Sequence, residues 1–358
     1  MRRRSIALPV AVLVPATIAA GLAVRFGTLY RERAGLPPRH PVADSPGARG
    51  LPWEPLTVRS PGGDLPGWFV RADGPGPRPA VVLVHGWGSN RARMLPFAAF
   101  LQAAGFHALL FDVRGHGESP PETLPMSGAE FGIDAAAAVD AAEARADVST
   151  VALLGHSMGG VGASLAAAAR PGVRALVIAS TPADPRLLVR ETFRMAELPI
   201  PAVVAHPLAW VTLRLLLRPR GHRVSAASAR HAVAAYRGPI LLVQGDADEL
   251  VPLRDLALLE RAAQGRTGSA PVRSLVVPGG RHRWLYEDAE VRRAIASFLA
   301  EALGLDTIPD EAGRLAAATD VRRTPDTDGP LFPNHETRGG TRPAGVPAPA
   351  PQPLTQEA

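Results

Sequence analysis

The chain has 358 residues, of which 46% are hydrophobic and 20% are charged. This composition can supply a full hydrophobic core, and it excludes a disordered polymer or a fibrous repeat. The chain contains no cysteine, so disulfide scaffolds, thiolate zinc sites, iron–sulfur clusters and cysteine nucleophiles are all excluded.

All 39 residues counted as Lys+Arg are arginine, and with 33 acidic residues they give a formal net charge of +6. The arginines are spread along the chain, and aromatic residues make up only 5% of it. A nucleic-acid-binding surface would instead gather basic and aromatic side chains on one face. We therefore expect no nucleic-acid partner.

Residues 1–34 have the pattern of a targeting or anchoring segment. Arginines at 2–4 precede an uncharged stretch over 5–24. That stretch is long enough to cross a bilayer as one helix, and it exceeds the apolar part of a typical cleavable signal peptide. We predict an N-terminal membrane anchor, with a cleaved signal segment and export as the alternative. A buried N-terminal helix of the fold is disfavoured because Pro9 and Pro15 interrupt the stretch.

The composition changes again further along the chain. Residues 35–52 are rich in Pro, Gly and Arg, which suits an extended linker. We expect a globular domain over 53–304. A polar, Pro-rich tail over 305–358 is expected to be disordered, apart from one short helix near 311–318.

Within the globular domain, short β-rich apolar runs alternate with Ala-rich helical patterns. The predicted strands are 56–60, 67–71, 80–85, 107–112, 150–155, 175–179, 240–244 and 274–277. The predicted helices are 91–104, 129–146, 158–169, 253–263 and 288–303. This alternation predicts an α/β fold with a mostly parallel central sheet covered by helices on both faces.

One interval, about 182–236, carries no strand pattern. A structureless loop of that length would be unusual in a compact domain, so we predict a helical cap inserted after the sixth strand. The apolar part of this cap, residues 202–217, has two interpretations. It forms either the core of the cap and the roof over a pocket, or an amphipathic surface that meets lipid.

The strongest single signal is the motif Gly-His-Ser-Met-Gly-Gly at 155–160, where an apolar strand pattern ends and a helical pattern begins. A sharp strand-to-helix turn would expose Ser157 at the carboxyl edge of the sheet, and the flanking glycines let strand and helix approach closely. The bare pattern G-x-S-x-G is weak in a glycine-rich chain. Its strand-to-helix setting makes Ser157 a candidate nucleophile.

A serine hydroxyl is a weak nucleophile near neutral pH, so this interpretation requires a base and a group that orients the base. The turns after the seventh and eighth predicted strands supply both. Asp248 follows the seventh strand and His282 follows the eighth. Asp246 is the alternative acid, because it lies closer to the end of its strand. The order serine, acid, histidine is the order that this architecture uses.

Together these motifs resemble the α/β-hydrolase superfamily over about residues 56–303. The resemblance includes two further loops, residues 85–88 (His-Gly-Trp-Gly) after the third strand and residues 112–119 after the fourth. The chain is most similar to the lipase-like and serine aminopeptidase-like serine hydrolases, in which a helical cap separates the sixth and seventh strands. The resemblance implies the α/β-hydrolase fold.

The resemblance also implies a role for each site residue. The acid of the family falls on Asp248 and its base on His282, which would take the proton of Ser157 during attack on an acyl carbonyl. The backbone N–H groups of Trp87 and Met158 would form the oxyanion hole. The implied enzyme cleaves a small-molecule carboxylic ester, an amide or a thioester through an acyl-serine intermediate, with neither a metal nor an organic cofactor.

Other polar and aromatic residues have structural interpretations. Three histidines in the motifs are expected to be turn and packing residues: His85, His116 and His156. Three more lie in or near the predicted cap without metal-ligand spacing: His206, His222 and His231. Three tryptophans are candidate pocket walls, with ordinary packing as the alternative: Trp87, Trp210 and Trp284.

Two other hypotheses remain open from sequence alone. A cofactor-free perhydrolase would use the same triad, and a catalytically silent member of the fold would act as a binding protein. Epoxide hydrolases and dehalogenases of this fold place Asp at the nucleophile, and Ser157 argues against them. Residue spacing encodes neither the substrate's acyl length and leaving group nor the oligomeric state.

Overall fold

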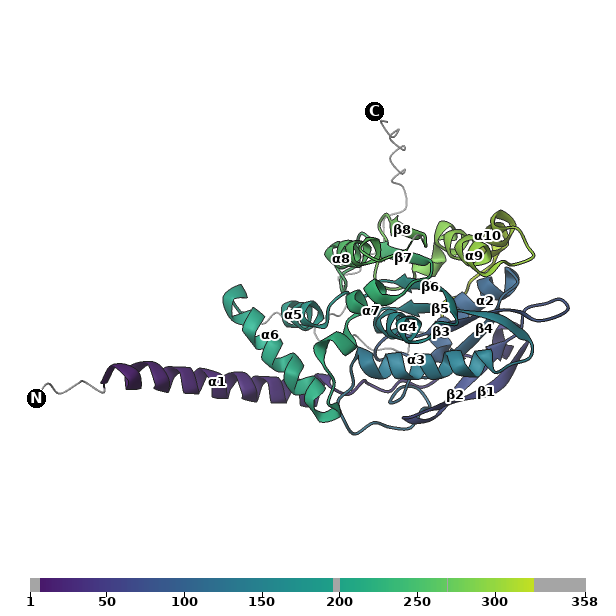
Figure 1. Ribbon diagram of the computed structural model, residues 1–358. Coiled ribbons are helices and arrows are strands. Elements are labelled where there is room, and N and C mark those ends of the chain that lie inside the picture. Colours follow the sequence, from purple (N-terminus) through teal and green to yellow (C-terminus); the bar gives the residue numbers. More distant parts are fainter. Residues whose placement is uncertain (1–6, 196–199, 269, 325–358) are drawn as a thin grey trace, which may run out of the picture.

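The structure is a computed structural model that describes residues 7–195, 200–268 and 270–324, with the side chains of 7–16 and 33 excluded. Its centre is an eight-stranded sheet with the order β1-β2-β4-β3-β5-β6-β7-β8 (Figure 1). The strands are β1 (Trp53–Ser60), β2 (Gly63–Val70), β3 (Arg78–Val84), β4 (His107–Phe111), β5 (Val148–His156), β6 (Val173–Ala179), β7 (Ile240–Gly245) and β8 (Val272–Val277). The pairs β1–β2 and β2–β4 are antiparallel, and the other neighbouring pairs are parallel.

Helices cover both faces of this sheet (Figure 1). One face carries α3 (Gly128–Glu143), α4 (Met158–Ala169), α7 (Ala229–Ala235) and α8 (Leu253–Gln264). The other face carries α2 (Leu95–Ala103) and α9 (Ala289–Leu303), with α10 (Pro309–Ala318) packed beside them. Short 3-10 turns are η1 (Gly47–Arg49), η2 (Arg91–Met94), η3 (Arg218–Arg220), η4 (Val224–Ala227) and η5 (Leu285–Glu287). The expected α/β-hydrolase architecture is confirmed.

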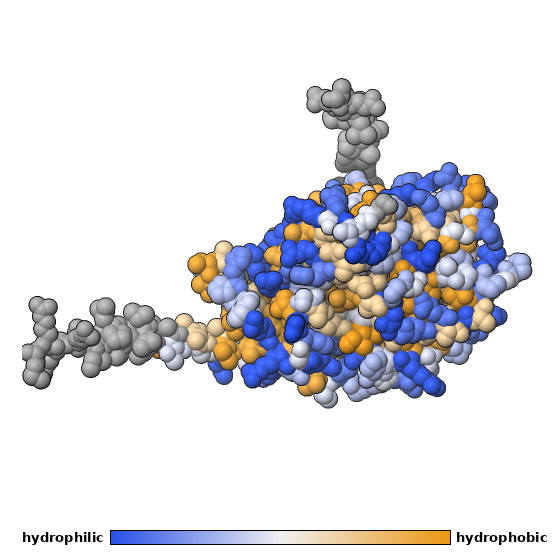
Figure 2. All heavy atoms as spheres, viewed as in Figure 1, coloured by the Kyte–Doolittle hydropathy of each residue, from blue (hydrophilic) through white to orange (hydrophobic). Residues whose placement is uncertain are grey.

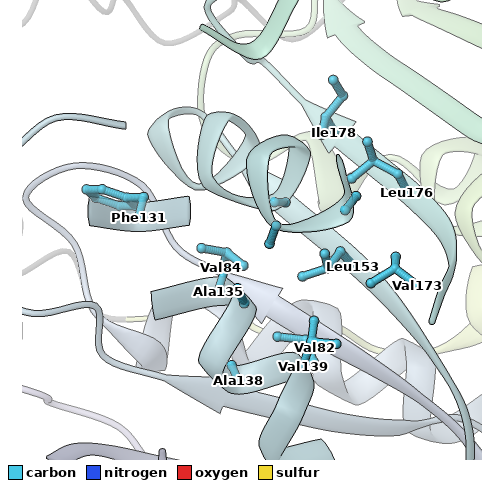
Figure 3. Close-up of a cluster of buried hydrophobic side chains, with 14 of the residues drawn as sticks. Val82, Val84, Phe131, Ala135, Ala138, Val139, Leu153, Val173, Leu176 and Ile178 are labelled. Atoms are coloured by element: carbon cyan, nitrogen blue, oxygen red, sulfur yellow. The ribbon is translucent and has the colours of Figure 1, made fainter. Parts of the chain in front are cut away.

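The core explains why the central strands lack a polar face. Val81 and Val82 on β3 are both fully buried although they point to opposite sides of the sheet. Figure 3 shows one of the two core layers, in which Val82 and Leu153 of the sheet lie close to Val139 of α3. Burial on both faces holds the central strands in place. Because these strands are parallel, their carboxyl ends lie along one edge of the sheet.

The interval between β6 and β7 is helical, as expected. It contains α5 (Pro185–Met195) and α6 (Ala202–Leu217), followed by η3, η4 and α7. Phe193 of α5 and Leu213 of α6 are 3% and 2% exposed, so this cap has an apolar core of its own. Trp210, midway along α6, is 44% exposed, and Val203, at the outer N-terminal end of this helix, is 80% exposed. Figure 2 shows the corresponding hydrophobic surface at this end.

Helix α1 (Ala7–Ala34) docks on this cap (Figure 1). The rings of Phe26 and Phe193 lie 5.3 Å apart, and Tyr30 Oη lies 2.9 Å from Thr192 Oγ1. A packed N-terminal helix was the disfavoured interpretation of the sequence. For the second half of α1 the structure shows a packed helix after all, because the aromatic residues Phe26 and Tyr30, which follow the apolar stretch, are partly buried against the core of the cap.

The anchor prediction rests on residues 5–24, most of which lie outside the part of the chain whose side chains are described. Across the described residues, no helix combines the length and the apolar character needed to cross a bilayer. The helix bounds include both prolines of the stretch, Pro9 and Pro15. The expected interruption of the helix at those positions is therefore not observed.

The expected linker, residues 35–52, lies across the loops at the carboxyl edge of the sheet. Arg39 Nη2 donates to Gly117 O at 2.9 Å and to Ser119 O at 2.8 Å. Asn90 Nδ2 donates to Pro41 O at 3.2 Å. The Pro and Gly content indicates an extended path, but it does not reveal these contacts with loops distant in sequence.

The prediction that a disordered tail starts at residue 305 is wrong, because the chain remains part of the fold well beyond that residue. Helix α10 packs against α9, with Ala312 and Ala316 fully buried. Thr324 Oγ1 donates to Ala92 O at 2.9 Å, so the chain is tied to the fold as far as residue 324. The polar composition of this segment does not reveal the docked helix, because only two small side chains, Ala312 and Ala316, four residues apart, are needed to pack α10 against α9. Residues 325–358 lie outside the described residues.

Candidate active site

Ser157 lies on the turn between β5 and α4, with φ 56° and ψ −122°. Few non-glycine residues adopt a positive φ, and such strain is found mainly at functional sites. Two glycines make the turn feasible. A Cβ on Gly155 would lie 2.3 Å from Gly159 O, and a Cβ on Gly159 would lie 2.1 Å from Val84 O. Ser157 N donates to Ala179 O at 2.9 Å, which ties the turn to the neighbouring strand β6.

Three side chains that are distant in sequence form one hydrogen-bonded line. Ser157 Oγ lies 3.0 Å from His282 Nε2, and His282 Nδ1 lies 3.0 and 3.1 Å from the two carboxylate oxygens of Asp248. An ionised carboxylate can only accept hydrogen bonds, so Nδ1 carries the proton and Nε2 can accept the proton of the serine. His282 is only 3% exposed, which limits competition from water.

The carboxylate of Asp248 is buried and well supplied with donors. Its Oδ1 accepts from Leu250 N at 2.9 Å and from Val251 N at 2.8 Å, and its Oδ2 accepts from Gln244 Nε2 at 2.8 Å. Burial acts to raise the pKa of Asp248, but the hydrogen bond and charge of His282, together with the two backbone N–H groups, outweigh it and hold this pKa below its usual value. Asp248 is therefore ionised at neutral pH.

The alternative acid, Asp246, does not contact His282. Its Oδ1 accepts from Gly279 N at 2.6 Å, so it fixes the turn after β8. Glu249 is closer, since its Oε2 accepts from His282 N at 3.4 Å, but 47% of its side chain is exposed. The structure thus brings Asp248 to the histidine ring.

The two residues predicted to supply the oxyanion donors, Trp87 and Met158, lie in segments next to Ser157. Met158 is the first residue of α4, so its N–H belongs to the free N-terminal turn of a helix. Gly86, which precedes Trp87, lies against Ser157: a Cβ added to it would lie 3.3 Å from Ser157 Cβ. The loop after β3 and the start of α4 therefore approach Ser157 from two sides.

A pocket of about 80 Å³ opens beside Ser157 and His282. Its walls come from the loop after β3, the start of α2 and the segment that follows His282. Trp87 and Trp284 line it, as predicted. Trp210 lies instead midway along α6, 44% exposed, with the guanidinium of Arg214 over its ring at 4.2 Å.

His156 has a contact with the triad that the sequence did not reveal. Its Nε2–H donates to the backbone oxygen of His282 at 2.7 Å, and the two rings lie 5.0 Å apart. Burial, aided by the nearby His282, lowers the pKa of His156 to about 3, so the ring is neutral at neutral pH. Sequence spacing carries no signal for this contact, because His156 occupies the variable position of the motif.

The other motif histidines make the contacts of turn residues. His85 Nδ1–H donates to Gly86 O at 2.8 Å, and its Nε2 accepts from Val113 N at 3.0 Å, which joins the loops after β3 and β4. Burial lowers the pKa of His85 to about 4. The ring of His116 packs 5.1 Å from the ring of His85. Within the described part of the chain, neither histidine is hydrogen-bonded to Ser157, and the structure gives both a supporting role in these loops.

Within the described ranges, no three His, Asp or Glu side chains are grouped so as to hold a metal ion. His222 pairs with the buried Glu130, and His231 Nδ1 lies 3.0 Å from Ser228 Oγ. His206 lies on α6. The three histidines in or near the cap thus lie in different environments and have different neighbours.

The sequence matches the family described as serine aminopeptidase, S33, over residues 75–223. It is 30% identical over 257 residues to a pimeloyl-[acyl-carrier protein] methyl ester esterase of Xanthomonas campestris pv. campestris, a match that covers 62% of this chain and 95% of that protein. It is 29% identical over 233 residues to a monoacylglycerol lipase of Mycolicibacterium smegmatis, a match that covers 58% of this chain and 81% of that protein.

The fold is similar to that of the Pyrococcus furiosus esterase Pf2001, with a TM-score of 0.59 and 20% identity, covering 75% of this chain and 100% of that one. At this identity the likeness concerns the fold alone. The sequence matches concern the family, and they include a relative that this chain covers almost completely. The chain therefore belongs to the α/β-hydrolase superfamily, among its serine hydrolases.

Proposed function

We propose that this protein hydrolyses a carboxylic ester through an acyl-enzyme formed on Ser157. The observation that carries the proposal is the 3.0 Å contact between Ser157 Oγ and His282 Nε2, in line with the carboxylate of Asp248. A serine becomes nucleophilic when a positioned base can take its proton. An esterase and a lipase among the relatives support an ester as the substrate.

In the acylation step, Ser157 Oγ forms a bond to the carbonyl carbon while its proton moves to His282 Nε2. The carbonyl electron pair moves to oxygen, and the N–H groups of Trp87 and Met158 would donate to this oxyanion. Loss of one such donor typically costs about 2.7 to 4 kcal/mol of transition-state stabilisation. The bond to the leaving alcohol then breaks, and His282 returns its proton to the alkoxide oxygen.

In the deacylation step, a water takes the place of the alcohol. His282 Nε2 removes a proton from this water, whose oxygen attacks the acyl-serine carbonyl. Collapse of the second tetrahedral intermediate releases the carboxylic acid, and the proton returns to Ser157 Oγ. Asp248 stays ionised throughout, which stabilises the imidazolium that forms twice in each cycle.

The first test is covalent labelling by a fluorophosphonate. We expect wild type to be labelled and Ser157→Ala not to be labelled. Ser297→Ala is a matched control, because Ser297 lies on α9 and its hydroxyl donates to Pro309 O at 2.8 Å. Labelling that persists in Ser157→Ala would remove this residue from its role. A folded wild type that is not labelled would favour a silent binding protein.

An amide is the second candidate substrate, because the matched family is described as serine aminopeptidase. The same three residues would act, with an amine as the leaving group. Hydrolysis rates for p-nitrophenyl esters of increasing acyl length, compared with aminoacyl p-nitroanilides, separate the two. We expect kcat/KM for the best ester to exceed that for the best anilide, and the reverse order would replace the ester proposal.

We also propose that residues 1–34 attach the enzyme to a membrane. The uncharged stretch over 5–24 and the preceding arginines support this. Full-length protein should stay with the membrane fraction after a carbonate wash, and a chain lacking residues 2–16 should not. A protein that starts near Val24 and is recovered in a soluble fraction would identify a cleaved signal segment instead.

A further inference from the structure

The N-terminal end of the cap helix α6, residues 202–208, forms an apolar tip on the outside of the molecule. Val203 is 80% exposed, and Val204 and Trp210 are also exposed. The sequence of α6 contains no Asp, Glu or Arg before Arg214. Single exposed apolar residues are ordinary, but a group of them on an uncharged helix end marks a surface that contacts a partner or a lipid phase.

Helix α1 exposes a second apolar surface on the same side of the molecule. Ile18, Leu22 and Val24 are exposed, and the sequence has no charged residue over 5–24. In Figure 1 this part of α1 and the tip of α6 both point away from the sheet, toward the left of the view. Figure 2 shows hydrophobic residues at the tip of α6 in the same orientation. The two apolar surfaces therefore face the same way.

The first charged residue of each helix lies near the point where the two helices cross. A Cβ on Gly27 would lie 3.3 Å from Thr212 Cα, which places the crossing at these two residues. Arg25 precedes Gly27 by two residues, and Arg214 follows Thr212 by two residues. Two residues correspond to about 3 Å along a helix axis. Both helices are therefore uncharged on the outer side of the crossing, and their charges begin at nearly the same level.

The side chains at this level are those that proteins place at a membrane surface. The guanidinium of Arg214 lies 4.2 Å from the ring centroid of Trp210, and Arg25 and Arg218 are exposed. Tryptophan and arginine are typical of the layer where lipid headgroups meet acyl chains. Across the described residues 202–220, no side chain is acidic. This positive charge complements the phosphates of an anionic lipid surface.

We propose that the tip of α6 inserts into the headgroup layer of an anionic membrane beside α1. This contact goes beyond ester hydrolysis, and it rests on the proposed attachment through residues 1–34 only for bringing the cap to the bilayer. Attachment through residues 1–34 alone would leave the catalytic domain able to turn at the membrane surface. A second contact on the cap would hold the domain in one orientation.

The test uses the full-length chain in vesicles of phosphatidylcholine and phosphatidylglycerol. The chain contains no cysteine, so one introduced cysteine can carry an environment-sensitive nitrobenzoxadiazole label. Val203→Cys places the label on the tip of α6. Ile308→Cys is the matched control, because Ile308 is 64% exposed and precedes α10, far from α6 in Figure 1. We expect brominated lipid to quench the label at 203 by about twofold, as insertion to the acyl boundary predicts, and to leave the label at 308 unchanged.

Two further changes test the chemistry of the contact. Val204→Asp, added to Val203→Cys, should remove most of the quenching, because a carboxylate is costly at the acyl boundary. Arg214→Gln with Arg218→Gln should weaken the quenching, and so should vesicles of phosphatidylcholine alone. Hydrolysis of p-nitrophenyl butyrate should stay at the wild-type rate in each variant, which shows that each is folded.

Equal quenching of the two labels, or no quenching at 203, would overturn the α6 contact. If a carbonate wash still leaves that protein on the membrane, the attachment through residues 1–34 stands. A blue shift of the label at 203 that occurs without lipid and grows with protein concentration would identify a second copy of the chain as the partner, and would also overturn the proposal. Quenching at 203 in a protein that the wash releases would support the α6 contact and count against the attachment through residues 1–34.

Discussion

The carboxylate of Asp248 and the backbone oxygen of His282 are the two points that fix the orientation of the triad imidazole. The Asp248 carboxylate accepts a hydrogen bond from His282 Nδ1, and His156 Nε2–H donates one to the backbone oxygen of His282. The imidazole is thus held at Nδ1 and through the backbone of its residue, while Nε2 faces Ser157 Oγ. Each support can be removed separately.

Replacing Asp248 with Asn should reduce kcat by about ten thousandfold with little change in folding. The amide would favour the wrong tautomer of His282, in which Nε2 carries the proton and cannot accept one from Ser157. Rates with p-nitrophenyl butyrate measure this. Asp246→Asn should stay within several-fold of wild type, and an equal loss in the two variants would contradict the assignment of the acid.

His156 is expected to act as a positioning residue. His156→Phe keeps a ring of similar shape but cannot donate to His282 O, and we expect kcat to fall by about tenfold, as the loss of one positioning hydrogen bond of about 1 to 1.5 kcal/mol predicts. His156→Gln retains a donor and should recover part of the rate. Because the pKa of His156 is lowered to about 3, neither change should move the acidic limb of the kcat/KM profile above pH 5. A shifted limb would mean that His156 itself titrates in the mechanism.

At the scale of whole elements, the contact between α1 and α6 depends on a glycine. A Cβ on Gly27 would lie 2.7 Å from Leu215 Cδ1 and 3.3 Å from Thr212 Cα, so an added methyl group would require the Leu215 side chain to move and the two helices to separate slightly. Gly21, on the same helix, has nothing within 4 Å of such a Cβ. The two positions form a matched pair.

Gly21→Ala should raise the stability of the folded chain slightly or leave it unchanged, because alanine favours a helix over glycine by about 1 kcal/mol. Gly27→Ala should lose this benefit and destabilise the docked helix by about 1 to 3 kcal/mol, the usual range for overpacking. Thermal melting and limited proteolysis of α1 provide the readout. Equal behaviour of the two variants would show that α1 does not pack on α6 in solution.

The sequence predicts the strands of the central sheet and the helices that directly follow them, because burial on both faces of the sheet makes these strands apolar throughout. Helix α4 begins and ends where expected, at Met158 and Ala169, because an apolar strand and a glycine-bounded turn delimit it. Docking of α1 and α10 could not be predicted in the same way. Their contacts use a few residues, such as Tyr30 and Ala316, whose partners are far away in the chain. The triad followed from strand order, whereas the Arg93–Trp284 contact depends on loop geometry that no spacing encodes.

At the scale of the whole molecule, buried neutral histidines determine how stability responds to acid. Burial lowers the pKa of His85 to about 4 and of His116 and His156 to about 3. In the unfolded chain each would titrate near about 6.5. Below that pH the unfolded state binds more protons than the folded state, so the free energy of unfolding must fall as the pH falls.

We therefore expect the melting temperature to decrease steadily from about pH 6.5 toward pH 4, before general acid denaturation. His116→Phe should flatten this slope, because one lowered histidine pKa is removed. His116 Nε2 has no hydrogen-bond partner among the described residues, which makes this substitution less disruptive than one at His85. A melting temperature that rises on acidification over the same range would contradict the buried, neutral state of these rings.

The path of residues 35–52 has a practical consequence for anyone preparing this enzyme. Arg39 and Pro41 are bonded to loops after β4 and β3, and a Cβ on Gly88 would lie 3.0 Å from Pro38. A chain trimmed to begin at β1 would therefore lose the segment that lies across the loops after β3 and β4, although it would keep the whole sheet and its helices. Poor turnover in such a preparation would reflect the trimming, and assays should start from chains that retain the segment from Leu36 onward.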